Sequence, residues 1–232
     1  MTASNGTRSE LSQTEVPAVS RPIKLIRGLF WVLLVGVFTG VFVAGLWSVL
    51  EGPIPSKDHS PPVLREEIVP DFALTERSGR TVTRADVLGK IWLAGFVFTR
   101  CTGPCPELSL RMRSIQQALK DFPPDVKLVT FTLDPTNDTP PVLREYADRF
   151  HADPERWWFL TGADEAGMHR LIREGFLQTV IPANATEALT HSTYFVLLDR
   201  QGRVRGVYDG PDAKSKTRII ADIEALLREP WP

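Results

Sequence analysis

The sequence predicts an α/β domain, in which a central mixed β-sheet is flanked by helices, preceded by one N-terminal transmembrane helix. Three observations carry this prediction. Strand-like and helix-like segments alternate after residue 67, residues 91–98 form a nearly continuous apolar run, and residues 28–50 contain no charged side chain. The composition agrees, because 43% hydrophobic and 24% charged residues among 232 are typical of one globular domain with a short addition.

Residues 28–50 are expected to cross a membrane. At about 1.5 Å per residue, this helix is long enough for a hydrocarbon core of roughly 30 Å. A cleaved signal peptide has a shorter apolar core of roughly 7 to 15 residues, so it fits this run less well. Arg21, Lys24 and Arg27 lie just before the run. This excess of basic residues favours a cytoplasmic N-terminal segment, residues 1–27, with the rest of the chain exported.

The N-terminal segment also indicates which membrane is crossed. It carries Glu10 and Glu15 and lacks an Arg-rich amphipathic presequence. This composition favours a bacterial inner membrane over a mitochondrial one, with the exported domain in the periplasm. Within the span, Gly36 and Gly40 form a GxxxG pair, a spacing that brings transmembrane helices together. Small residues are common in such helices, so a homodimer stays open rather than predicted.

The exported part divides into a tether and a domain. Residues 51–67 are rich in proline and charge, as in an extended linker, and the globular domain is expected over residues 68–232. The whole chain has a formal net charge of −1 and contains no cluster of lysine and arginine. Because neutralisation of phosphates needs such a cluster, no nucleic-acid partner is expected.

The first elements of the domain follow from turn residues and periodicity. Two short strands, 72–75 and 80–82, flank a Ser-Gly turn and form an N-terminal β-hairpin. Residues 91–98 are apolar throughout, as expected for a central strand buried on both faces. Apolar residues at helical spacing predict an amphipathic helix over 106–120, beginning with a proline, which the first turn of a helix permits.

The later elements are predicted in the same way. We expect strands over 127–133, 193–198 and 204–208, and helices over 140–150, 165–173 and 219–227. The resulting order is hairpin, β, α, β, α, α, β, β, α. This order fits a thioredoxin-like architecture.

The cysteines indicate chemistry rather than a structural role. Cys101 and Cys105 are the only two, too few and too close together to staple a domain of this size. Both follow the central strand 91–98, at the edge where open α/β sheets bind ligands. A helix N-terminus lowers the pKa of a cysteine placed there, and Cys105 is the better placed of the two. The three intervening residues form a loop wide enough for both thiolates to bind one metal ion or to close a disulfide.

A third ligand is expected from a loop at the same edge of the sheet. His191 lies just before the strand 193–198, which in a thioredoxin-like topology begins beside the cysteines. Two thiolates and one imidazole suit Cu(I), whereas a closed structural zinc site takes four ligands. A lone histidine is more often a surface or hydrogen-bonded residue, so spacing alone leaves the role of His191 open. The remaining histidines are expected in the tether or on solvated helix faces: His59, His151 and His169.

Two aspartates lie between the strand 127–133 and the helix 140–150. Asp138 or Thr139 is expected to cap this helix. The cap does not need Asp134, so a second role at the mouth of the site is open to it. Both aspartates are candidates for contacts around the metal ligands.

Residues 68–227 resemble the SCO/SenC family, copper proteins that help assemble cytochrome c oxidase. The resemblance is carried by Pro70-Asp71-Phe72, Gly89-Lys90, Phe98-Thr99-Arg100-Cys101 with Cys105-Pro106, Asp134-Pro135 with Asp138-Thr139-Pro140, Phe159-Leu160-Thr161-Gly162, His191-Ser192, Asp199-Arg200-Gln201-Gly202 and Val207-Tyr208-Asp209-Gly210. It implies a thioredoxin-like fold, copper held by Cys101, Cys105 and His191, and delivery to the binuclear copper centre of the oxidase. The family commonly has an acid before this histidine, whereas here the residue is Thr190, a change expected to alter ligand basicity and metal affinity.

Two functions stay open from the sequence. In the first, reduced Cys101 and Cys105 bind Cu(I) with His191 and pass it to the copper-bearing oxidase subunit by ligand exchange. In the second, the two cysteines cycle to a disulfide and keep the cysteines of that subunit reduced, with no lasting metal. A peroxidase shares the fold, but the closely spaced cysteines and the export signal argue against it. The identity of the oxidase, the upstream copper donor, the thiol reductant and the binding of Cu(II) are left open.

Overall fold

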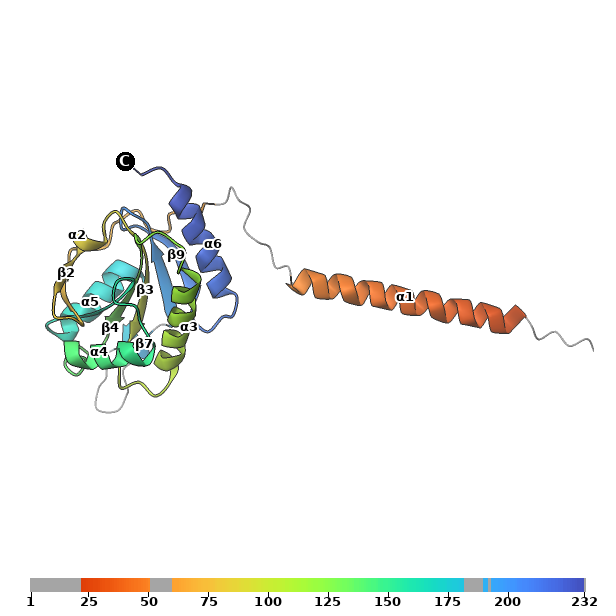
Figure 1. Ribbon diagram of the computed structural model, residues 1–232, viewed down its shortest axis with the longest axis horizontal. Helices are drawn as coiled ribbons and strands as arrows, with labels where there is room; N and C mark the ends of the chain where they lie inside the picture. The colour runs from red at the N-terminus through yellow and green to blue at the C-terminus, as the bar shows by residue number, and fades with distance from the viewer. Residues whose placement is uncertain (1–21, 51–59, 182–189, 192, 232) are drawn as a thin grey trace, which may run out of the picture. The chain divides into compact units, whose positions relative to one another are not determined.

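The computed structural model describes residues 22–50, 60–181, 190–191 and 193–231 (Figure 1). The chain separates into two compact units, Met1–Pro53 and Ile54–Pro232. The first unit contains helix α1, Pro22–Leu50, which includes the predicted span. Among the residues whose side chains are described, no helix is both long and apolar enough to cross a membrane, so the transmembrane prediction is not confirmed.

The second unit is built on a seven-stranded mixed sheet. Its strands lie in the order β2-β1-β5-β4-β3-β8-β9, with β3, β4 and β5 parallel and the other neighbours antiparallel. The strands are β1 (Ala73–Glu76), β2 (Thr81–Thr83), β3 (Ile91–Val97), β4 (Val126–Thr132), β5 (Trp157–Thr161), β8 (Tyr194–Leu198) and β9 (Val204–Asp209). This arrangement confirms the predicted α/β class with a central mixed sheet and an N-terminal hairpin.

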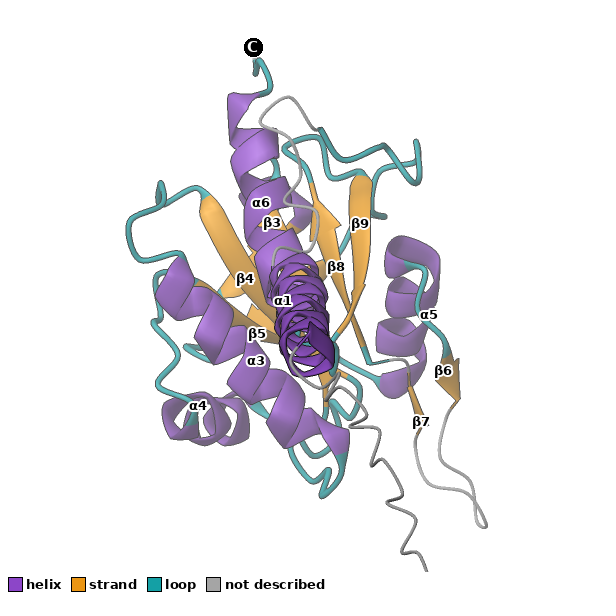
Figure 2. Ribbon diagram, turned by 90° about the vertical axis from the view of Figure 1, so that its right-hand side faces the viewer, coloured by secondary structure: helices purple, strands orange, loops and turns teal. Residues whose placement is uncertain are grey.

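Helices cover both faces of this sheet (Figure 2). They are α2 (Arg84–Val87), α3 (Pro104–Ala118), α4 (Pro140–Arg149), α5 (Glu165–Phe176) and α6 (Ser215–Arg228). Helices α3, α4 and α6 pack on one face, and α5 packs on the other. The side chains of β3 alternate between the two cores, with Leu93 on the first face and Trp92 and Phe96 on the second. Because β3 faces a core on both sides, all of its residues are buried, and its sequence is apolar throughout.

Three strands lie outside the predicted order. Strand β5 pairs with β4 and β1 and is buried along its whole length. It is too short for its periodicity to distinguish a strand from part of a buried helix, which is why the pattern does not predict it. Strands β6 (Val180–Ile181) and β7 (Thr190–His191) form a separate antiparallel pair that joins α5 to β8.

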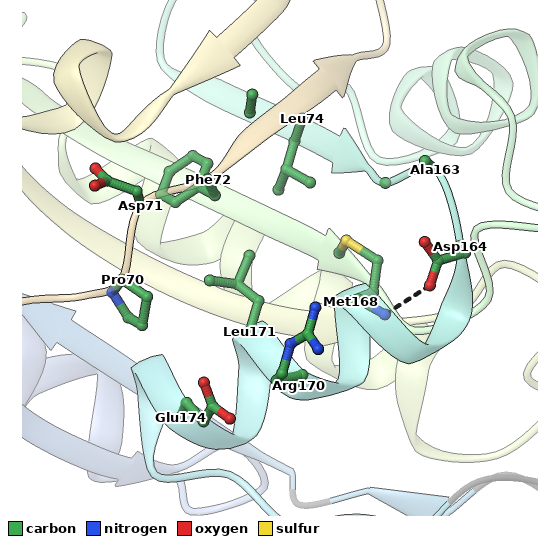
Figure 3. A pocket seen from close by; sticks show the side chains of 13 residues that line it. Pro70, Asp71, Phe72, Leu74, Ala163, Asp164, Met168, Arg170, Leu171 and Glu174 are labelled. Carbon is green, nitrogen blue, oxygen red and sulfur yellow. Dashed lines mark hydrogen bonds between the residues drawn. The ribbon is translucent and has the colours of Figure 1, made fainter.

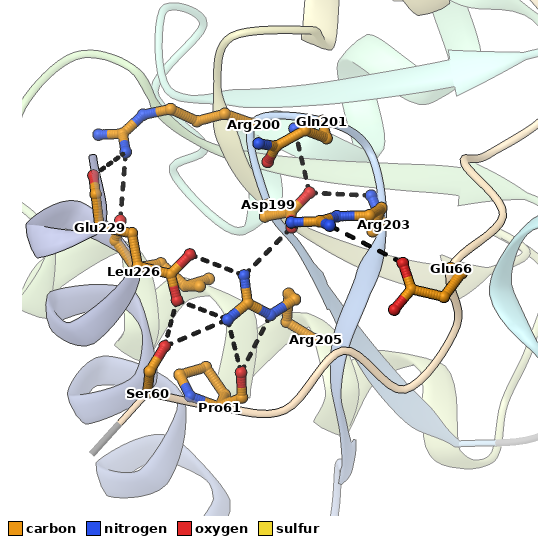
Figure 4. Close-up of polar contacts among 10 residues, drawn as sticks. All are labelled: Ser60, Pro61, Glu66, Asp199, Arg200, Gln201, Arg203, Arg205, Leu226 and Glu229. Atoms are coloured by element: carbon orange, nitrogen blue, oxygen red, sulfur yellow. Dashed lines mark hydrogen bonds and ion pairs between the residues drawn. The ribbon is translucent and has the colours of Figure 1, made fainter. Parts of the chain in front are cut away.

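Residues 60–66, which belong to the predicted tether, lie against β9 (Figure 4). The N–H of Leu64 donates to the carbonyl of Val204 at 2.8 Å. The buried guanidinium of Arg205 donates to the carbonyl of Pro61 at 2.6 and 3.0 Å and forms an ion pair with Glu229 of the C-terminal region at 2.5 Å. Because β9 is the last strand of the sheet, these bonds cover an edge that would otherwise present unpaired backbone groups.

Candidate metal centre

The two predicted cysteine ligands lie in residues 98–105, here called the cysteine loop, which run from the end of β3 into the first turn of α3. The N–H of Cys101 donates to the carbonyl of Phe98 at 3.2 Å, so the chain turns directly after the strand. Gly103 occupies the N-cap position of α3 and Pro104 is its first residue, where a missing N–H costs no intrahelical bond. Cys105 therefore lies in the first turn of α3, and both sulfur atoms are carried at the carboxyl end of the central strand.

Cys101 and Cys105 are both free thiols, with no disulfide between them. Cys105 is fully buried in the core beneath α3, whereas Cys101 is partly exposed. One thiol can thus be reached from solvent while the other lies behind it. An incoming metal ion or disulfide would meet Cys101 first.

The pKa of Cys105 departs in the opposite direction from the one predicted. Burial raises the pKa of this thiol and the neighbouring Cys101 adds to the rise, while a hydrogen bond with the backbone of Phe98 lowers it. The prediction of a lowered pKa at the helix N-terminus is therefore wrong, because desolvation of the thiolate outweighs the dipole of the helix. Cys105 is expected to lose its proton only when a metal ion or a disulfide bond takes its place.

Asp138 anchors the start of the cysteine loop from a fully buried position. Its carboxylate accepts a hydrogen bond from the backbone N–H of Thr99 at 3.1 Å and another from the hydroxyl of Thr99 at 2.5 Å. The hydroxyl of Thr132, the last residue of β4, donates to the same carboxylate. Burial raises the pKa of Asp138, and these hydrogen bonds oppose the rise. Asp138 thus ties the end of β4 to the residue two positions before Cys101.

Helix α4 begins without the predicted side-chain cap. Thr139 occupies the N-cap position, but its side chain makes no capping hydrogen bond, and the carboxylate of Asp138 is turned to the cysteine loop instead. Pro140 and Pro141 are the first two residues of α4 and have no N–H, so the N2 donor that a cap would satisfy is missing.

Asp134 holds the next residue of the cysteine loop. Its nearly buried carboxylate accepts hydrogen bonds from Nε and Nη2 of Arg100 at 3.1 and 2.7 Å, and from the side-chain amide of Asn137 at 2.8 Å. The hydrogen bond from Arg100 to Asp134 raises the pKa of Arg100. Both predicted aspartates therefore contact the cysteine loop, through the two residues that precede Cys101.

Tyr146 supports the loop from the other side, and the sequence analysis does not identify it. Its hydroxyl lies 2.8 Å from the hydroxyl of Ser109 and donates to the carbonyl of Cys105 at 3.4 Å. Burial raises the pKa of Tyr146 to about 12. The position of Tyr146 on the apolar face of α4 is a signal for burial, but only the packing of α4 on α3 brings its hydroxyl to Cys105.

The third predicted ligand is only partly described. Strand β7 places the backbone of His191 opposite Val180 of β6, while the side chain of His191 lies outside the described part of the structure. Among the side chains that are described, no group of three or more histidine, cysteine, aspartate and glutamate residues could hold a metal ion. The structure therefore brings Cys101 and Cys105 together, and the role of His191 stays a prediction.

His169 is buried rather than solvated, contrary to the prediction. It is 3% exposed, and its ring Nε2 lies 2.7 Å from the carbonyl oxygen of Leu133. Ile172 and Phe176 follow it at helical spacing on the buried side of α5, and this pattern could have identified His169 as facing the core. The remaining two are the exposed His151 and His59, which lies outside the described residues.

A pocket of about 240 Å³ lies elsewhere, between the segment before β1 and helix α5 (Figure 3). Phe72, Leu74 and Met168 contribute apolar side chains to it, and Asp164 and Glu174 lie on its rim. Neither Cys101 nor Cys105 lines this pocket. The pocket is therefore separate from the cysteine loop.

Comparisons with known proteins agree with this description. A family model described as SCO1/SenC matches residues 61–228. The SCO1 protein homolog of Bacillus subtilis strain 168 is 29% identical over 162 residues, which are 70% of this chain and 83% of that relative. A solved structure of BsSco, described as a member of the Sco family of cytochrome c oxidase assembly proteins with a disulfide switch, has a TM-score of 0.66 and 26% identity, over 74% of this chain and 100% of that one.

A structure of Bradyrhizobium japonicum ScoI with copper bound is also similar, with a TM-score of 0.57 and 25% identity over 69% of this chain and 99% of that one. The mixed sheet and its helices thus match the predicted thioredoxin-like fold. The matched residues of the family model include both cysteines and His191 and cover most of the sequence. This chain therefore belongs to the SCO1/SenC family.

Proposed function

We propose that this protein is a membrane-anchored carrier of Cu(I), which delivers the ion to the binuclear copper centre of cytochrome c oxidase. Copper is its cargo, and Cys101, Cys105 and His191 are the proposed ligands. The observation that carries the proposal is the pair of free thiols that follow β3, one buried and one reachable from solvent. Thiolates are soft ligands of the kind that Cu(I) favours.

The course of the backbone supports His191 as the third ligand. Strand β7 ends at His191 and leads within a few residues into β8, which lies beside β3 in the sheet. Because β8 runs antiparallel to β3, with Val196 opposite Ala94, β8 begins at the end of β3 that leads into the cysteine loop. The copper-bound structure of the similar Bradyrhizobium japonicum protein supports copper as the cargo.

The two aspartates are proposed to preserve the geometry of the cysteine loop rather than to bind copper. Asp138 fixes Thr99 and Asp134 fixes Arg100, so the backbone entering Cys101 is held from two directions. A preorganised loop reduces the conformational entropy that would be lost when both thiolates converge on one ion.

Delivery is proposed to proceed by exchange of ligands. A cysteine of the oxidase subunit approaches the exposed side of the site, where Cys101 lies, and replaces one ligand at a time. Because Cys105 is buried, it is expected to leave the ion last. This order keeps the ion bound to at least one thiolate throughout the transfer.

A thiol–disulfide oxidoreductase is the second candidate, and the accessible Cys101 backed by Cys105 favours it. The Cys101 thiolate would attack a disulfide of the oxidase subunit, forming a mixed disulfide and releasing one substrate thiol. Cys105 would then attack the sulfur of Cys101 and release the second thiol. The product is a Cys101–Cys105 disulfide, which a separate thiol reductant must reduce by two electrons. This reaction needs no ligand at His191.

An anaerobic titration of the reduced full-length chain with Cu(I), in competition with a chromogenic chelator, separates the two functions. We expect one equivalent to bind tightly, Cys101→Ser and Cys105→Ser each to abolish binding, and His191→Ala to weaken it strongly. His151→Ala is the matched control, because His151 is exposed and lies far along the chain from the cysteine loop. Stoichiometric binding retained by either serine variant would overturn the carrier, whereas weak binding indifferent to His191 would leave the reductase.

We further propose that residues 28–50 anchor the protein in a bacterial inner membrane, with residues 1–27 in the cytoplasm and the domain in the periplasm. The support is the uncharged run of these residues and the basic residues before it. Extraction of membranes with alkaline carbonate should leave the chain in the pellet. Release into the supernatant would show that the chain is cleaved or only peripherally attached.

The proposed partner is the copper-bearing subunit of the oxidase. Cells that lack this protein should assemble an oxidase deficient in copper at its binuclear centre, and the intact chain should restore it. A chain with Cys101→Ser should not. Normal copper content in the absence of the protein would show that it serves another acceptor.

A further inference from the structure

Helix α5 lies on the other face of the sheet from α3 (Figure 2). It nevertheless contacts Leu133, which directly precedes Asp134, one of the two aspartates that hold the cysteine loop. The contact is made by His169, whose ring Nε2 lies 2.7 Å from the carbonyl oxygen of Leu133. A carbonyl oxygen can only accept, so Nε2 carries the hydrogen and donates. With 3% of its surface exposed, His169 makes this bond out of contact with bulk water.

The peptide of Leu133 is a junction between three elements. Its N–H donates to the carbonyl of Val97, the last residue of β3, at 2.9 Å. Its carbonyl accepts from His169 of α5, and Asp134 follows it directly in the chain. Any displacement of Leu133 is therefore transmitted both to the end of β3 and to the segment whose carboxylates hold Thr99 and Arg100.

The other end of α5 leads into β6, which pairs with the strand that carries His191. Phe176, its last residue, packs against the rings of Trp92, Phe96 and Phe131, with centroid distances of 5.7, 5.3 and 4.9 Å. This aromatic cluster fixes the C-terminal end of the helix in the core.

The chain then continues from the end of α5 into β6. The side chain of the buried Gln178 donates to the carbonyl of Phe176 at 3.0 Å. The buried Val180 pairs with His191. Through β6, the backbone of His191 is thus joined to the C-terminal end of α5.

We infer that α5 is the element that sets the spacing between the cysteine loop and the strand of His191, and that His169 is the positioning residue through which it acts. This inference rests on the proposed copper site, whose ligands come from both segments. His169 does not touch the thiols. It fixes Leu133, and the hydrogen bonds of Leu133, Asp134 and Asp138 pass this constraint to the residues before Cys101.

The test compares His169→Leu, which removes the donor, with His169→Gln, whose side-chain amide can reach the same carbonyl. Ile172→Val is the matched control, because it loosens the buried face of α5 without touching the hydrogen bond. The first readout is hydrogen exchange of the full chain without metal. In His169→Leu, the amides of Thr99 and Leu133 should exchange at least ten-fold faster, while the amides of β8 and β9 stay unchanged. His169→Gln should restore slow exchange.

The second readout is affinity for Cu(I) by chelator competition. His169→Leu is expected to bind about ten-fold more weakly, in the range seen when groups supporting metal ligands are removed, and His169→Gln to recover most of the loss. If His169→Leu unfolds, His169→Asn replaces it, because its amide is too short to reach Leu133 and should behave as His169→Leu is expected to.

The results separate this inference from the proposed function. Unchanged exchange at Thr99 and Leu133 in both donor-deleted variants would overturn the inference, whatever the chain binds. Faster exchange with unchanged Cu(I) affinity, or equal effects in Ile172→Val, would also overturn it. Failure of the unmodified chain to bind Cu(I) would overturn the proposed function, and the exchange data would still decide whether His169 holds the cysteine loop.

Discussion

Replacing Asp138 with alanine should destabilise the domain and loosen the cysteine loop together. The substitution removes a fully buried acceptor of three hydrogen bonds: those from the N–H and hydroxyl of Thr99 and from the hydroxyl of Thr132. A buried donor left without an acceptor costs about 1–3 kcal/mol. The N–H of Thr99 cannot turn elsewhere, so it contributes at the upper end of this range.

Two effects reduce the total for Asp138→Ala. The two hydroxyls can rotate, and removing a carboxylate whose pKa burial has raised also removes the cost of desolvating its charge. We therefore expect a loss of about 3 kcal/mol in the free energy of unfolding. Asp138→Asn should lose about 1 kcal/mol, because its carbonyl oxygen can keep the bonds from the Thr99 N–H and the Thr132 hydroxyl while its amide donates to the Thr99 hydroxyl.

Urea unfolding of the full-length chain, followed by tryptophan fluorescence, measures both losses. The rate at which Cys101 reacts with a maleimide reports on the loop and should rise in Asp138→Ala more than in Asp138→Asn. Glu145→Ala on the exposed side of α4 is the control and should change neither quantity. A loss below about 1 kcal/mol in Asp138→Ala would refute the reasoning, because the Thr99 N–H would then have another partner.

Three further predictions follow from the same structure. The hydrogen bond from Arg205 holds the pKa of Glu229 below its usual range. This pair should therefore stabilise the domain at pH values above the unfolded pKa of about 4.3, and its contribution should be lost as the pH falls through the lower folded pKa. Glu229→Gln should flatten the dependence of the urea midpoint on pH in that acid range. An unchanged slope would exclude the pair as the source of this dependence. Cys101 should react with iodoacetamide faster than Cys105, which is buried and has a raised pKa, and mass spectrometry of the singly labelled chain that found Cys105 modified first would contradict the described exposures. Gly210→Ala would place a methyl group 2.5 Å from the backbone oxygen of Thr193, just before β8, and 2.1 Å from the side chain of Leu108 in α3. We therefore expect the free energy of unfolding, measured in urea, to fall by about 1–3 kcal/mol. An unchanged free energy of unfolding would mean that the backbone at Thr193 can shift.

The parts of the fold that could be predicted were those with strong local patterns. Strand β3 is apolar along its length because it is buried on both faces, and α3 presents Leu108, Met112 and Ile115 at helical spacing. Strand β5 has no such signal, since a short apolar run fits a strand or a buried helix equally well. The pair β6 and β7 is shorter still, and it joins residues 180–181 to residues 190–191.

The candidate site divides in the same way. The position of Cys101 and Cys105 at the end of β3 followed from the order of strand, loop and helix along the chain. The direction of the pKa shift of Cys105 did not, because the prediction weighed the helix dipole, which is local, without the burial, which depends on α3 packing against the sheet. His169 was misplaced for a related reason, because a polar residue on an amphipathic helix was assigned to solvent although its spacing placed it on the buried side.

The sequence by itself determined the class of fold, the location of the cysteine loop and the resemblance to a copper-protein family, because each of these is written in short segments whose residue types and spacing have a local physical meaning. Only the tertiary structure decided that Cys105 is buried behind Cys101, that Asp138 serves Thr99 rather than a helix cap, and that His169 reaches Leu133. These contacts join residues tens of positions apart. Burial and hydrogen-bond partners of this kind arise only when strands and helices pack, since the free energy of a charged or polar group depends on the solvent and the neighbours that packing leaves it.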